Sequence, residues 1–64
     1  MVKVNGEQLD MNEKTVSELL DIKGFDPLKT AVELNEDIVP KAQYSSTVLK
    51  DGDCVEVVSF VGGG

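Results

Sequence analysis

Histidine and tryptophan are absent from this sequence, and cysteine occurs once, as Cys54. The absence of histidine removes the most common general base of enzymes. A single cysteine can form neither an internal disulfide nor a Cys/His zinc site. Asp51 and Asp53 flank Gly52, but the terminal glutamate of an EF-hand calcium loop is missing at the required spacing. The sequence therefore predicts no catalytic side chain, no metal and no bound cofactor, and its lone thiol suits the cytoplasm.

Long apolar runs and positive charge are also scarce. No run approaches the roughly 20 apolar residues that span a bilayer, and the N-terminus does not have the pattern of a secretory signal. Twelve acidic residues outnumber six basic ones, for a net charge of -6. Nucleic acid and anionic membranes would repel such a chain, so neither is expected as a partner. The acidic excess either keeps the protein soluble or steers it toward basic protein surfaces.

Turn signals and alternating apolar residues predict a sheet. Residues 1–11 are expected to form a β-hairpin around Asn5-Gly6, a preferred type I′ turn pair. Asp51-Gly52 predicts a second turn that leads into a strand rich in β-branched residues. The remaining strands, including this last one, are predicted at residues 30–34, 38–39 and 54–61.

A capping box predicts the single helix. Thr15-Val16-Ser17-Glu18 has the form in which the Thr15 hydroxyl and the Glu18 carboxylate each accept a hydrogen bond from a free backbone N–H. The helix is expected to begin at Val16 and to end at Gly24 after about two turns. Its apolar stripe, at the spacing of one helical face, consists of Val16, Leu19 and Leu20.

Two further expectations concern packing around the connectors. Phe25 and Leu28 flank a proline-containing connector and are expected to cover one end of the core. Residues 41–47 are predicted to form a loop or a single helical turn. Tyr44, within that segment, is expected to pack its ring and expose its hydroxyl.

These elements predict an α+β domain with two layers, in which one main helix covers one face of a mixed sheet of four to five strands. Residues 1–61 would form the domain and residues 62–64 a flexible glycine tail. If Val55 and Val57 of the last strand face the core, Val58 and Phe60 stand on the opposite face. Val58 and Phe60 are then candidate partner-binding residues. The alternative is that Phe60 folds back over the end of the sheet.

Three motifs together carry a family resemblance. Residues 34–41 (LNEDIVPK), residues 51–58 (DGDCVEVV) and a C-terminal Gly-Gly closely resemble the sulfur carrier proteins of bacterial thiamin biosynthesis. Those proteins are ubiquitin-like β-grasp domains, and the resemblance covers nearly the whole chain. The third glycine, Gly62, departs from the minimal Gly-Gly pattern.

The resemblance implies a covalent role for Gly64. An E1-like adenylyltransferase would consume ATP to adenylate the Gly64 carboxylate, and a sulfur donor such as a cysteine desulfurase would convert it to a thiocarboxylate. Thiazole synthase would then receive the sulfur. Gly62, Gly63 and Gly64 would enter the partner's site, so the chain is expected to be a carrier and not an enzyme.

Other readings of the glycine end remain open. A Gly-Gly end alone equally suits the sulfur carrier of molybdopterin synthase or another ubiquitin-like modifier, although those chains are usually longer. A more distant alternative is a non-catalytic interaction module. Blocking the C-terminal carboxylate would not change the function of such a module.

Overall fold

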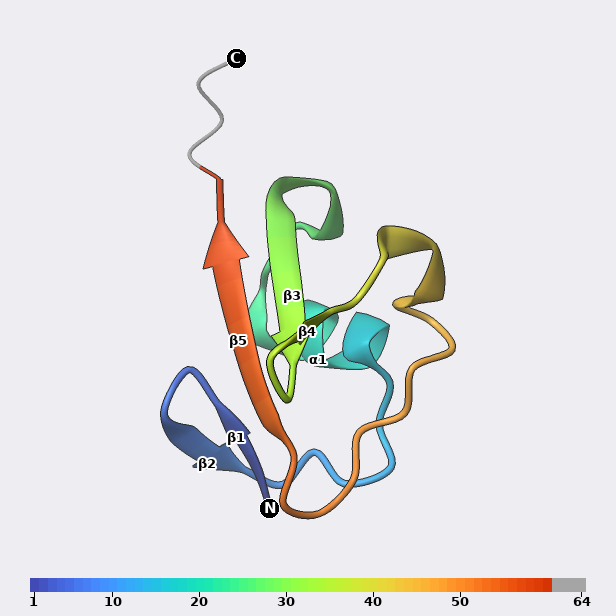
Figure 1. Cartoon of the computed structure of the whole chain (residues 1–64). Helices are drawn as coiled ribbons and strands as arrows, with labels where there is room; N and C mark the ends of the chain where they lie inside the picture. The colour runs from blue at the N-terminus through green and yellow to red at the C-terminus, as the bar shows by residue number, and fades with distance from the viewer. Residues whose placement is uncertain (61–64) are drawn as a thin grey trace.

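Five strands form one mixed sheet in the computed structural model, which describes residues 1–60 (Figure 1). The order in the sheet is β2-β1-β5-β3-β4, so β5 is central, parallel to β1 and antiparallel to β3. Helix α1 (Val16–Lys23) lies behind the sheet in Figure 1. The α+β class and the mixed sheet are confirmed. The strands are β1 (Val2–Val4), β2 (Glu7–Leu9), β3 (Thr30–Leu34), β4 (Asp37–Ile38) and β5 (Cys54–Ser59).

The predicted first hairpin is present, and its turn also supports the central strand. Asn5 and Gly6 both have positive φ, at 48° and 86°, as a type I′ turn requires. The Asn5 side chain accepts a hydrogen bond from the Val57 N–H (2.7 Å) and donates one to the Val57 carbonyl (3.1 Å). Beyond the end of β1, the Asn5 side chain thus takes the place of a strand backbone as the hydrogen-bond partner of β5. The hairpin was predicted to extend to residue 11, but its second strand, β2, ends at Leu9. Met11 is buried and lies outside that strand.

Helix α1 has the predicted bounds and caps. The Thr15 N–H donates to the Glu18 carboxylate (2.9 Å), and the Glu18 N–H donates to the Thr15 hydroxyl (3.1 Å). Gly24 takes the left-handed conformation, with φ of 81°, that ends a helix without a Cβ clash. The three apolar positions that face the sheet are all buried, namely Val16, Leu19 and Leu20.

The capping box makes the stability depend on pH. The hydrogen bond from the Thr15 backbone holds the pKa of Glu18 below its usual 4.5. A carboxylate whose pKa is lower in the folded state stabilises the fold above the unfolded pKa, and this stability is lost as pH falls through the folded pKa. We expect Glu18→Gln to lower the urea midpoint at neutral pH, and we expect the difference from wild type to disappear as pH falls through the folded pKa of Glu18.

The matched control for this pH prediction is Asp21→Asn, which removes one charge from the same helix but leaves the capping box intact. Its urea midpoints should follow the wild-type pH curve. A Glu18→Gln curve parallel to wild type at every pH would contradict the assigned role of the carboxylate.

The core lies between α1 and the sheet and includes segments far apart in sequence. Phe25 packs against it as predicted, whereas Leu28 is 79% exposed. Leu28 points outward because residues 27–29 form a short 3₁₀ turn, η1 (Pro27–Lys29), capped by the Asp26 side chain. The buried apolar residues are Val2, Val4, Met11, Val16, Leu19, Leu20, Val32, Val39, Tyr44, Leu49, Val55 and Val57.

Tyr44 differs from its prediction. A single helical turn, η2 (Lys41–Gln43), precedes it as expected, but the Tyr44 hydroxyl is buried and donates to the Thr30 carbonyl at 3.3 Å. The hydroxyl finds this partner because the chain after β4 continues beside β3, where the Val39 N–H donates to the Val32 carbonyl at 2.9 Å. No helix within residues 1–60 has the length and apolar character needed to cross a membrane.

Candidate functional site

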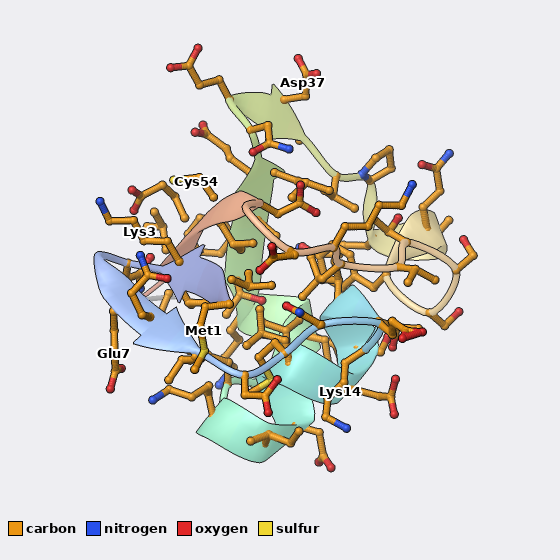
Figure 2. The ribbon with its side chains drawn as sticks, turned by 90° about the horizontal axis from the view of Figure 1, so that it is seen from below. Met1, Lys3, Glu7, Lys14, Asp37 and Cys54 are labelled. Carbon is orange, nitrogen blue, oxygen red and sulfur yellow. The ribbon has the colours of Figure 1, made fainter. Side chains whose placement is uncertain are left out.

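The sheet face opposite α1, called the outer face here, is open to solvent. Figure 2 shows Cys54 and Lys3, neighbours on β5 and β1, on this side of the sheet. Val58 is 58% exposed and Phe60 is 53% exposed, while Val55 and Val57 are buried. The predicted division of the last strand into a core side and an outer side is therefore confirmed.

The register between β3 and β5 divides the outer face into two parts. Toward the end of β5, Ala31 lies opposite Val58, and Phe60 follows on the same side. Toward the start of β5, Glu33 lies opposite Glu56. The outer face is thus apolar next to the C-terminal segment and acidic farther from it.

The acidic part is an open depression. It is lined by Glu33, Asn35, Glu36, Cys54 and Glu56. Like charges directly opposite one another on paired strands destabilise a sheet, so the pairing of Glu33 with Glu56 does not stabilise this one. No group of three or more His, Cys, Asp or Glu in residues 1–60 is arranged to hold a metal ion.

Backbone and side-chain bonds of Asn35 fix one rim of this depression. The Cys54 N–H donates to the Asn35 side chain at 3.0 Å, and the Asn35 N–H donates to the Cys54 carbonyl at 2.8 Å. The Asn35 amide also donates to the Asp53 carboxylate at 3.0 Å. These hydrogen bonds join the start of β5 to the turn that follows β3, at the acidic depression. The Cys54 thiol itself is free and exposed.

The end of β5 has its own set of contacts. The Phe60 N–H donates to the Lys29 carbonyl at 2.7 Å. The Lys41 ammonium lies 5.9 Å from the centre of the Phe60 ring and donates to the Thr30 carbonyl at 2.7 Å. Phe60 is thus half exposed beside a cation rather than buried in the core.

The predicted glycine tail, Gly62, Gly63 and Gly64, lies outside the described residues, as does Val61. The predictions for Gly64 as the covalent residue and for all three glycines as partner-binding residues therefore stay predictions. The structure places Val58 and Phe60 at the end of the strand from which those residues continue.

Sequence reasoning assigned no role to Glu33, Ile38 or Lys41. The alternation of residues 30–34 places Glu33 on the side away from Val32, but its position opposite Glu56 depends on a register that no local pattern encodes. Ile38, on β4, is exposed and lies opposite Glu33 of β3. Lys41 gave no sequence signal, because its contacts come from separate segments.

Comparisons with known proteins agree with this architecture. The family model described as the ThiS family matches residues 2–64. The chain is 39% identical to the sulfur carrier protein ThiS of Thermus thermophilus, and the alignment covers all of both chains. A crystal structure of the thiamine biosynthesis protein ThiS from Geobacter metallireducens superposes with a TM-score of 0.76 at 37% identity, covering 98% of this chain and 97% of that one. This likeness confirms the predicted β-grasp fold.

The chain also resembles one part of a larger kind of protein. It is 45% identical over 62 residues to a thiazole synthase of Paramagnetospirillum magneticum. The chain spans about a fifth of the length of this relative and of a second thiazole synthase, from Magnetococcus marinus, at 19% and 20%.

Proposed function

Because the chain belongs to the ThiS family, we propose that it is a sulfur carrier of thiamin biosynthesis that carries sulfur on the Gly64 carboxylate. The proposal rests on the end-to-end match to a sulfur carrier protein of the same family. The sequence supplies a Gly-Gly end and lacks histidine, which suits a protein whose chemistry is performed by its partners.

The proposed chemistry needs only a carboxylate from this chain. The Gly64 carboxylate attacks the α-phosphate of ATP on an E1-like adenylyltransferase, and pyrophosphate leaves. A persulfide supplied by a cysteine desulfurase then attacks the acyl carbon, and AMP leaves. A thiol reduces the resulting acyl disulfide to the thiocarboxylate. A carboxylate is a poor electrophile, and adenylation supplies the leaving group that it lacks.

The described residues suit a docking role for the folded body. The apolar part of the outer face, with Val58 and Phe60, adjoins the end of β5 and can bury apolar surface against a partner. The acidic depression near Glu33 and Glu56 favours a partner surface that carries lysine or arginine. Three glycines in extended form reach about 10 Å, enough to enter a narrow site while the body stays outside.

Thiazole synthase is the proposed acceptor of the sulfur. The similarity of this chain to part of two thiazole synthases supports this acceptor over molybdopterin synthase. A carrier and its acceptor enzyme must meet, and a carrier-like stretch within the acceptor's own chain would raise the effective concentration of one for the other.

Pyrophosphate exchange tests the first proposed step. The chain is mixed with ATP, labelled pyrophosphate and an E1-like adenylyltransferase from a thiamin pathway, and label entering ATP is measured. Exchange that requires the chain supports the proposal. Exchange that proceeds equally without the chain, or not at all with an enzyme that activates a known ThiS protein, refutes it.

Docking through the outer face predicts an effect of Val58→Asp. The new carboxylate would be buried against the partner and would add to the nearby acidic charge, so the KM for the chain in pyrophosphate exchange should rise about tenfold or more. The matched control is Ile22→Asp, on α1, where the side chain is 55% exposed. Equal effects of the two substitutions would show that net charge, and not the outer face, sets the KM.

A further inference from the structure

Four residues from three segments meet at the end of β5. The ammonium of Lys41, the first residue of η2, lies near two aromatic rings, 5.8 Å from the centre of the Tyr44 ring and 5.9 Å from that of Phe60. The same ammonium donates to the Thr30 carbonyl at 2.7 Å. The Tyr44 hydroxyl donates to that carbonyl as well, at 3.3 Å. Thr30, on β3, is thus the anchor of the group.

Lys41 is exposed at the surface, but its ammonium contacts other groups of the chain. The ion pairs found within residues 1–60 join Met1 to Asp51 and Lys23 to Glu7, and Lys41 belongs to neither. Its contacts are a backbone carbonyl and two ring faces. An ammonium within about 6 Å of a ring centre is attracted by the ring's π-electrons, and the Lys41 ammonium lies at such a distance from Phe60 while it bonds to β3.

Phe60 is the point at which the chain leaves the described body. β5 ends at Ser59, and beyond it the Phe60 N–H still pairs with the Lys29 carbonyl at 2.7 Å. Two contacts therefore fix Phe60, one through its backbone and one through its ring. The ring contact is the one that a single side chain, Lys41, supplies.

We propose that Lys41 is a positioning residue for the reactive terminus: its ammonium, anchored on the Thr30 carbonyl, holds the Phe60 ring and sets the direction in which the chain leaves β5. This inference rests on the proposed function for its catalytic consequence, but the contact itself can be tested without any partner. Lys41 acts through Phe60 and does not touch the reacting atoms.

Amide hydrogen exchange tests the contact in the isolated chain. Lys41→Met keeps the length of the side chain and removes the charge. The Phe60 amide should then exchange about two- to fivefold faster, the factor expected for loss of a cation–π contact at a half-exposed site. The core amides of Val32 and Val57 should be unchanged. Lys41→Arg should restore slow exchange, because a guanidinium can donate to the carbonyl and stack on the ring.

Steady-state pyrophosphate exchange tests the positioning role. Because the rest of the outer face still docks, Lys41→Met should lower kcat by about two- to fivefold and leave KM unchanged. In a Phe60→Leu background, Lys41→Met should cause no further loss. Lys50→Met is the charge-matched control, since Lys50 is exposed and precedes the turn that leads into the start of β5, whereas Phe60 follows the end of that strand.

Each outcome bears on the proposal. Unchanged exchange at the Phe60 amide overturns it, and so does a raised KM with normal kcat, which would make Lys41 a direct contact of the partner. An effect that Lys50→Met reproduces assigns the result to net charge and overturns it as well. If the wild-type chain is not activated at all, the carrier function fails, while the amide exchange still decides whether Lys41 holds Phe60.

Discussion

Replacing the Gly64 carboxylate by a carboxamide is expected to abolish adenylation. The amide lacks the anionic oxygen of a carboxylate, and its neutral carbonyl oxygen is a much weaker nucleophile toward the α-phosphate of ATP. Pyrophosphate exchange should therefore fall to the level seen without the chain. The variant can be made by chemical ligation, with the free acid made in the same way as its matched control. Both proteins should unfold at the same urea concentration, because the predicted tail lies beyond the packed residues.

A carboxamide that is activated like the free acid would contradict the assignment of Gly64. Deletion of one glycine is a separate experiment, because the shortened chain still ends in Gly-Gly. It moves the carboxylate closer to the folded domain by about 3.5 Å. The experiment therefore measures how strongly activation depends on the length of the glycine tail.

Leu19→Ala is expected to have the largest effect on folding. Leu19 is fully buried between α1 and the sheet, and truncation of a buried leucine costs about 2 to 5 kcal/mol. A domain of this size has a total free energy of unfolding of about 3 to 10 kcal/mol, so the variant should be partly or largely unfolded at 37 °C.

Urea denaturation followed by circular dichroism measures the Leu19→Ala effect. Ile22→Ala is the control on the same helix, since the Ile22 side chain is exposed and its loss should change the free energy of unfolding by no more than about 0.5 kcal/mol. Equal midpoints for the two variants would show that α1 does not supply the core.

The parts of the fold that local sequence determines were predicted correctly. The Asn5-Gly6 turn and the Thr15 to Glu18 capping box depend on neighbouring residues only, and both occur as predicted. The alternation of β5 placed Val55 and Val57 in the core and left Val58 and Phe60 exposed, because one strand has only two faces.

The errors concern residues whose environment comes from distant segments. Tyr44 buries its hydroxyl because the Thr30 carbonyl, on β3, lies at the end of its ring. Leu49 is fully buried, and its N–H donates to the Lys14 carbonyl at 2.8 Å, yet no periodic pattern surrounds it. Leu28 looked like a core residue by its type, but the turn of η1 directs it outward.

The candidate site shows the same division. Alternation could place Glu33 and Glu56 on the outer face, but the register that sets them opposite one another joins strands far apart in the sequence. The contact between Lys41 and Phe60 needs η2, β3 and the end of β5 together. Such contacts follow from the assembled fold and not from any one stretch.

The intact mass of the chain after reaction with its partners tests the central claim most directly. The chain is incubated with ATP, an E1-like adenylyltransferase, a cysteine desulfurase, cysteine and a reducing thiol, and is then weighed whole and after fragmentation. The account predicts that one oxygen is replaced by sulfur and that the change lies on Gly64. An unchanged mass under conditions that thiolate a known ThiS protein, or sulfur found on Cys54 instead, would contradict it.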